Sequence, residues 1–205
     1  MISALSAEGL RLERGRRRLI DDLSFRVEAG EALALTGANG AGKTSLLRAL
    51  AGLLRPAAGQ VRFFDGMAEH QPDAARAALH WLGAEDGLKG QARAEAELRF
   101  WTRWSGGEPA AAPTAMAELG LADRAGLQIR QLSSGQRRRL ALARLIAAPR
   151  ALWLLDEPLA PLDAAWRARL GELMARHLAG GGLIVAAVHD PLPVPARTLT
   201  LGEAT

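Results

Sequence analysis

The 205 residues are enough for one domain with a substantial hydrophobic core, and the composition excludes several kinds of function. No cysteine is present, which excludes disulfides, thiolate metal sites and thiol redox chemistry. Basic residues number 26 and acidic residues 22, so the net charge of +4 does not indicate a nucleic-acid-binding protein.

The sequence shows no segment that would insert into a membrane. No apolar run approaches the roughly 20 residues that a membrane-spanning helix needs, and residues 1–8 lack the charged start and long apolar run of a signal peptide. We therefore expect a cytoplasmic protein that reaches a membrane only through a partner.

Alternating and apolar segments predict strands in the first third of the chain. Residues 8–28 alternate as in the hairpin of an antiparallel edge sheet, and residues 59–66 indicate another short strand between turn glycines. Residues 31–36 predict a short buried strand. The hairpin carries a basic cluster that suits a solvated edge, with contact to phosphates as the alternative: Arg14, Arg16, Arg17 and Arg18.

A glycine-rich loop follows the strand at 31–36 and precedes a helical run at 45–53. Its pattern, G-x-x-x-x-G-K-T between a strand and a helix, is typical of a loop that binds nucleotide phosphates through its backbone N–H groups. Lys43 is predicted to pair with the β- and γ-phosphates, and Thr44 to offer its hydroxyl to Mg²⁺. The predicted phosphate-binding residues are Gly37, Ala38, Asn39, Gly40, Ala41, Gly42, Lys43, Thr44 and Ser45.

The middle of the chain predicts a helical lobe. Residues 86–133 show no buried-strand pattern, and helical periodicity marks residues 94–104 and 113–119. Three tryptophans lie around the start of this stretch: Trp81, Trp101 and Trp104. Packing within the lobe explains them best, and the alternative is a groove for a partner protein, because rigid aromatic side chains favour interfaces.

A polar segment opens the next predicted helix. It consists of Leu132, Ser133, Ser134, Gly135 and Gln136. Free N–H groups and the helix dipole favour an anion at such a position, although the segment taken alone is an ordinary helix N-terminus.

Five apolar residues at 151–155 lead into two adjacent carboxylates, Asp156 and Glu157, before Pro158 ends the pattern. The run predicts a strand buried on both faces, and ligands of parallel sheets bind at the carboxyl ends of such strands. Combined with the phosphate loop, this predicts that Asp156 holds the Mg²⁺ shell and that Glu157 polarises an attacking water.

The last part of the chain returns from helix to strand. Residues 163–178 predict a long amphipathic helix that glycines at 180–182 end, and residues 183–202 predict strand. His189 directly follows the apolar run at 183–188.

The sequence resembles the ATP-binding-cassette (ABC) ATPases. Three features together carry the resemblance: the phosphate loop, the segment at 132–136, and the pair Asp156 and Glu157. The L-S-G-G-Q signature of that family is matched with a serine in place of its first glycine. The resemblance implies an α/β P-loop NTPase fold with a central, mostly parallel sheet, an antiparallel β edge subdomain and an inserted helical subdomain at about residues 86–133. It also implies one nucleotide-binding domain over residues 1–205 that binds ATP and Mg²⁺.

Further implied features concern the partner subunit and the nucleotide. The resemblance implies a head-to-tail homodimer in which the signature of one subunit closes on the ATP of the other. Residues 159–163 resemble the D-loop, with Asp163 in place but with Ala160 and Pro161 where serine and alanine are usual. His189 is similar to the switch histidine that contacts the γ-phosphate, and with Lys43 and Glu157 it completes the implied catalytic set.

Two positions depart from the family pattern. Glu85 falls where the Q-loop glutamine is usual, so it is a candidate Mg²⁺ ligand that adds negative charge beside Asp156 and Glu157. Arg14 falls where an aromatic residue usually stacks on adenine. Since the chain has no tyrosine, the arginine plane is the candidate to stack on the base.

Within the ABC ATPases, the sequence resembles most specifically the CcmA family, the ATP-binding subunits of bacterial cytochrome c maturation. Four segments carry this resemblance: residues 40–53, 97–101, 151–158 and 177–182. This implies a peripheral protein on the cytoplasmic face of the inner membrane, a homodimer bound to the integral membrane subunits of a haem-export (Ccm) complex. ATP hydrolysis would drive release of the haem-loaded periplasmic chaperone. The resemblance calls for no nucleic-acid partner and for no direct haem binding by this chain.

Three alternatives remain open at this point. The chain could be the ATPase subunit of another ABC transporter, or an ATP-dependent clamp that hydrolyses poorly, as Glu85, Ala160 and Arg14 suggest. A nucleic-acid-associated ABC ATPase is disfavoured, because the sequence shows one cassette and no coiled-coil heptads. The transported species is not encoded in any of these motifs.

Overall fold

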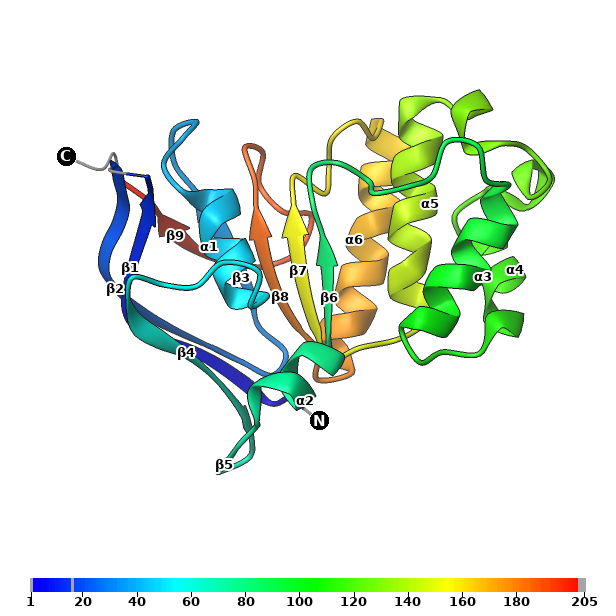
Figure 1. Ribbon diagram of the computed structural model, residues 1–205. Coiled ribbons are helices and arrows are strands. Elements are labelled where there is room, and N and C mark those ends of the chain that lie inside the picture. Colours follow the sequence, from blue (N-terminus) through cyan, green and yellow to red (C-terminus); the bar gives the residue numbers. More distant parts are fainter. Residues whose placement is uncertain (1, 16, 203–205) are drawn as a thin grey trace.

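The computed structural model describes residues 2–15 and 17–202, which fold around two sheets (Figure 1). Arg16 of the predicted basic cluster lies outside the described residues. The central sheet has the strand order β6-β7-β8-β3-β9, and each neighbouring pair is parallel. Its strands are β3 (Ala32–Thr36), β6 (Leu79–Leu82), β7 (Leu152–Asp156), β8 (Leu183–Ala187) and β9 (Arg197–Thr200).

The second sheet is antiparallel and confirms the predicted edge hairpin. It has the order β2-β1-β4-β5, formed by β1 (Ala4–Arg14), β2 (Arg17–Glu28), β4 (Ala58–Asp65) and β5 (Ala68–Glu69). The hairpin begins earlier than the predicted residue 8, because β1 pairs on both sides at once, with Leu5 opposite Val27 and Phe63.

Helices connect the strands and cover the central sheet. The α-helices are α1 (Lys43–Leu50), α2 (Pro72–Ala77), α3 (Ala94–Trp104), α4 (Ala112–Glu118), α5 (Ser134–Ala147) and α6 (Ala164–Ala179). Short 3₁₀ turns are η1 (Pro109–Ala111), η2 (Ala122–Arg124) and η3 (Ile129–Gln131). Figure 1 shows α3, α4, α5 and α6 on one side of the central sheet and the antiparallel sheet on the other.

Two hydrophobic clusters lie on the two faces of the central sheet. Along β7, Leu152 and Leu154 join the cluster shared with α1 and the antiparallel sheet, while Trp153 and Leu155 join the cluster shared with α5 and α6. Every residue of β7 is buried, which confirms the predicted strand covered on both faces. The α/β class with a parallel core sheet, an antiparallel edge sheet and a group of helices is likewise as predicted.

The predicted strand over residues 183–202 is wrong in its middle part. β8 ends at Ala187 and β9 begins at Arg197, with no helix or strand between them. Three prolines, Pro191, Pro193 and Pro195, explain the gap, because proline has no N–H to donate to a sheet ladder. In the described part of the chain, no helix is both long and apolar enough to cross a membrane.

Candidate functional site

The glycine-rich loop joins β3 to α1 in a conformation that requires glycine. Gly37, Gly40 and Gly42 have φ of 131°, 84° and 101°. A Cβ on Gly37 would also lie 2.4 Å from the backbone oxygen of Leu201. The loop therefore depends on these glycines to bring its backbone around the N-terminus of α1, where N–H groups without helical partners attract phosphate oxygens.

Lys43 and Thr44, the first two residues of α1, point into the site. The Lys43 ammonium is buried and donates to the backbone oxygens of Gly37 (2.6 Å) and Ala38 (3.3 Å). The Thr44 hydroxyl donates to Asp156 Oδ2 at 2.8 Å. Thr44 and Asp156 thus place a hydroxyl and a carboxylate oxygen together, the kind of donors that Mg²⁺ accepts.

Glu157 follows Asp156 at the end of β7 and has a left-handed backbone, with φ of 49°. Its Oε1 lies 3.3 Å from His189 Nε2. Burial raises the pKa of the Glu157 carboxyl and the neighbouring Asp156 adds to the rise, while His189, Lys43 and Arg138 act in the opposite direction. A carboxylate of raised pKa is a stronger base, which suits a role in orienting and deprotonating water.

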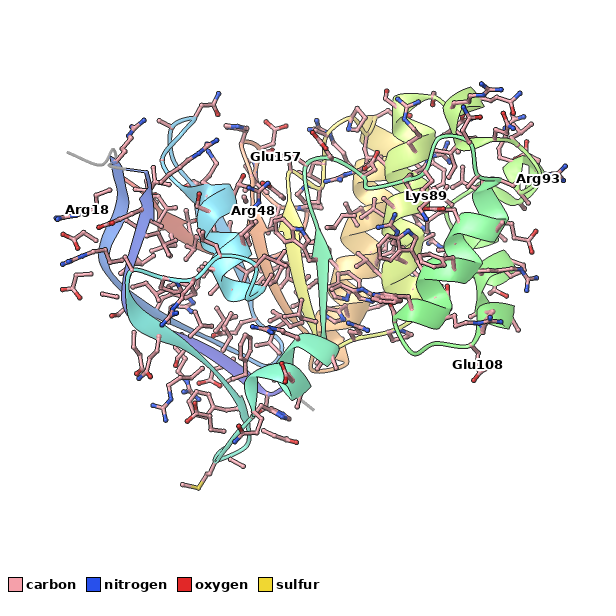
Figure 2. The ribbon with its side chains drawn as sticks, in the orientation of Figure 1. Arg18, Arg48, Lys89, Arg93, Glu108 and Glu157 are labelled. Atoms are coloured by element: carbon pink, nitrogen blue, oxygen red, sulfur yellow. The ribbon has the colours of Figure 1, made fainter. Side chains whose placement is uncertain are left out.

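A cavity of about 540 Å³ collects most of the predicted site. It is lined by Lys43, Thr44, Asp156, Glu157 and His189, together with the glycine loop, Arg14 and Ser45. Figure 2 shows Glu157 at the carboxyl end of the central strands, and Arg18 at the outer edge of the antiparallel sheet, away from the site. Parts of the chain separated by more than a hundred residues thus form one pocket.

Arg17, a member of the basic cluster noted in the sequence, also lines this cavity, and three further lining residues have no counterpart among the predicted site residues: Leu19, Arg48 and Ala84. Arg48 lies four residues after Thr44 on α1, so helical spacing places it on the same face, and this signal could have identified it. Arg17 and Leu19 enter the cavity only because the antiparallel sheet packs beside the glycine loop, which no local pattern reveals.

The predicted signature and D-loop residues lie outside this cavity. Ser133 is the N-cap of α5: its Oγ accepts from the Gln136 N–H, and the Ser133 N–H donates to Gln136 Oε1 at 2.8 Å. Asp163 caps α6 by accepting from the Trp166 N–H at 2.9 Å. Both segments present polar helix starts away from the cavity of their own chain.

Glu85 lines a different depression, a groove of about 670 Å³ on the other side of residues 83–87. The neighbouring residue Ala84 lines the cavity beside the glycine loop instead. The groove also contains Trp81, Trp101 and Trp104, and the last is 74 % exposed. A metal-ligand role of Glu85 therefore stays a prediction, and the three tryptophans line an accessible groove.

Comparison with known proteins identifies relatives over almost the whole chain. The ABC transporter family profile matches residues 20–160. The chain is 51% identical over 200 residues to the cytochrome c biogenesis ATP-binding export protein CcmA of Rhodopseudomonas palustris (strain BisB5), covering 98% of both chains. It is 46% identical over 194 residues to the protein of the same name from Rhizobium meliloti (strain 1021), covering 92% of both.

Solved structures share the fold at lower identity. A putative ABC transporter ATP-binding protein from Pyrococcus furiosus superposes with a TM-score of 0.81 at 20% identity, covering 97% of this chain and 98% of that one. A bacterial Atm1-family ABC exporter with ATP bound gives a TM-score of 0.77 at 22% identity, covering all of this chain and 38% of the exporter chain. These similarities concern the fold alone.

Proposed function

Because this chain belongs to the CcmA family of ABC transporter ATP-binding proteins, we propose that its ATP hydrolysis drives release of a haem-loaded chaperone from a membrane complex of cytochrome c maturation. The observation that carries the proposal is the cavity in which Lys43, Thr44, Asp156, Glu157 and His189 meet. An ABC ATPase supplies the free energy of ATP hydrolysis, so the process that it drives depends on the subunits to which it binds.

We assign the phosphate contacts to the glycine loop and Lys43. Backbone N–H groups of residues 37–45 would surround the β- and γ-phosphates, with the Lys43 ammonium exchanging its carbonyl partners for phosphate oxygens. Thr44 and Asp156 would hold Mg²⁺, which neutralises charge on the transferred phosphate when bound. Arg14 and Arg17 are the candidates to stack on the base.

Glu157 is the proposed general base. Its carboxylate would orient and deprotonate the water that attacks the γ-phosphorus, and His189, 3.3 Å away, would contact the γ-phosphate and keep the carboxylate in place. The segment at Leu132–Gln136 and Asp163 would act on the ATP of a second copy, since both lie outside the cavity of their own chain. This is the reason to propose a head-to-tail homodimer.

The groove that contains Trp81, Trp101 and Trp104 is the proposed contact with an integral membrane subunit. It holds exposed aromatic area beside Arg144 and Arg150, and such amphipathic anchors favour protein interfaces. The chain would then be peripheral, held at the cytoplasmic face of the inner membrane by this contact. Residues 86–133, as an inserted helical lobe of one nucleotide-binding domain, would form one wall of the groove.

The test measures the covalent haem content of periplasmic c-type cytochromes. It uses a strain whose only copy of this protein carries Glu157→Gln. We expect haem attachment to collapse while the variant protein accumulates normally, because hydrolysis loses its base. Glu172→Gln, which alters an exposed carboxylate on α6, is the matched control and should leave attachment unchanged. Normal haem attachment in the Glu157→Gln strain would contradict the proposal. The membrane protein that co-purifies with the chain would then have to be identified.

A further inference from the structure

We propose that Arg138 is a positioning residue for ATP hydrolysis, because its buried guanidinium ties residues 83–87 to the backbone of both carboxylates at the end of β7. The inference rests on the proposed function, since it concerns the same carboxylates. It adds a residue on α5 that lies outside the cavity but controls the geometry of a group inside it.

Arg138 makes four contacts through its two terminal nitrogens. Nη1 donates to the Gly83 oxygen at 2.9 Å and to Asp86 Oδ1 at 3.0 Å. Nη2 donates to the backbone oxygens of Asp156 and Glu157, both at 2.7 Å. The side chain is 1% exposed, so water does not compete for these bonds. One guanidinium therefore joins three elements: α5, the segment after β6 and the end of β7.

The contact with Glu157 acts where the backbone is strained. A non-glycine residue in the left-handed region is unfavourable and persists only when its surroundings impose it. The Glu157 N–H donates to the Ala187 oxygen at 3.0 Å, and Arg138 holds its carbonyl from the other side. The two bonds hold the peptide groups before and after the Glu157 Cα, and thereby the direction in which the side chain leaves the backbone.

The other half of the guanidinium binds residues that line the tryptophan groove. Gly83, Asp86 and Gly87 line that groove, and Arg144, two turns further along α5, donates to the backbone oxygens of Asp86 and Gly87. The Arg144 guanidinium also lies over the Trp101 ring at 4.3 Å. A displacement of residues 83–87 by anything that occupies the groove would thus pull on Arg138 and, through it, on Glu157.

Packing alone does not require an arginine at this position. Desolvating a guanidinium is costly, and replacement of buried ionic groups by apolar residues of similar volume is often neutral for stability. Arg138 Nε moreover has no hydrogen-bond partner among the described residues. The four contacts of the Nη atoms are therefore best explained by a positioning role: they hold residues 83–87 against the backbone of Asp156 and Glu157.

The experiment compares Arg138→Met and Arg138→Lys with Arg139→Met in the full chain. Arg139 is the matched control, because it also donates to two backbone oxygens, those of Leu119 and Gly120, but does not contact β7. We measure kcat and KM for ATP and the amide hydrogen exchange of residues 83–87 and 155–157 in the nucleotide-free protein.

For Arg138→Met we expect kcat to fall by roughly 100-fold, because small displacements of a catalytic group have effects of that size. KM should change by less than about threefold, since Arg138 does not line the cavity. Exchange should accelerate in both segments together. Arg138→Lys should restore part of kcat, and Arg139→Met should leave kcat and the exchange of both segments near wild type.

A kcat for folded Arg138→Met within about twofold of wild type would overturn the inference, as would an equal loss in Arg139→Met. Should Arg138→Met fail to fold, Asp86→Asn weakens the same tie from its other end, and an unchanged kcat in that variant also overturns it. A wild-type chain without ATPase activity would refute the proposed function instead. In that case, unchanged amide hydrogen exchange of residues 83–87 and 155–157 in the Arg138 variants would show that Arg138 does not hold these two segments together.

Discussion

Three histidines show how the surroundings of a residue decide what it does. His189 lies beside Glu157 in the cavity, half exposed. His177 stacks on Trp153 with ring centroids 3.9 Å apart, and burial lowers its pKa. His80, on β6, is buried and its Nε2 lies 2.6 Å from the Ala148 oxygen, so the neutral ring donates there. Burial lowers the pKa of His80 to about 4.

His80 should make the protein less stable in acid. Its pKa is about 4 when folded and about 6.5 when unfolded, so the unfolded chain binds more protons and stability falls as the pH drops through that window. The full effect is about 3 kcal/mol in the free energy of unfolding. Urea unfolding at pH 7.5 and pH 5 should show a smaller acid loss for His80→Gln than for wild type, and equal losses would contradict this origin.

Helix starts carry much of the local structure of this protein. α5 begins with a reciprocal pair between Ser133 and Gln136, and α6 begins with the Asp163 carboxylate bonded to the Trp166 N–H. Such caps satisfy N–H groups that the helix itself leaves free. The proposed signature and D-loop therefore have two roles: they hold a helix start in their own subunit, and we propose that they contact nucleotide in another.

Substitution of Asp163 should separate these two roles. Asp163→Ala should lower the free energy of unfolding by about 1 kcal/mol, because α6 loses its N-cap. Asp163→Asn keeps an oxygen that can accept from the Trp166 N–H, so its stability should stay near wild type. A drop of ATPase activity in Asp163→Asn at unchanged stability would support a contact between subunits, whereas activity equal to wild type would show that capping is its only role.

At the scale of the whole molecule, two depressions share the segment of residues 83–87. Ala84 lines the cavity beside the glycine loop, whereas Glu85 and Asp86 line the tryptophan groove. A molecule bound in the groove would therefore be one short segment away from Asp156 and Glu157, the proposed catalytic carboxylates. Through this segment, the proposed membrane partner and the proposed ATP site would influence each other without a shared contact.

Trp104 offers a direct test of the groove. Because its side chain is exposed and stacks mainly on Phe100, Trp104→Ser should leave the thermal midpoint nearly unchanged. Co-purification with integral membrane proteins should decrease, as an exposed aromatic anchor is lost. Met67→Ser, at an even more exposed apolar residue of the turn between β4 and β5, is the control. Equal co-purification of wild type and Trp104→Ser would argue against docking at this groove.

Several elements could be predicted from the residues alone, because local chemistry specifies them. The glycine loop needs positive φ at Gly37, Gly40 and Gly42, and the apolar run before Asp156 demands burial on both faces, so both were predictable from residue types and spacing. The helix at 94–104 followed from periodicity, and the start of the helix after Ser133 followed from its capping residue. The prolines after residue 190 are a signal in the sequence against a continuous last strand.

Which side chains meet depends on how the elements pack in three dimensions. Arg138 stands in a run of three arginines that indicates a solvated helix face, yet it is buried because α5 packs across the ends of β6 and β7. Glu85 and Ala84 are neighbours in sequence, but the path of the chain after β6 places them in different depressions. Local patterns fix backbone preference, whereas the burial of a residue such as Arg138 and the contacts between distant segments arise from how whole elements pack, which no short stretch of sequence encodes.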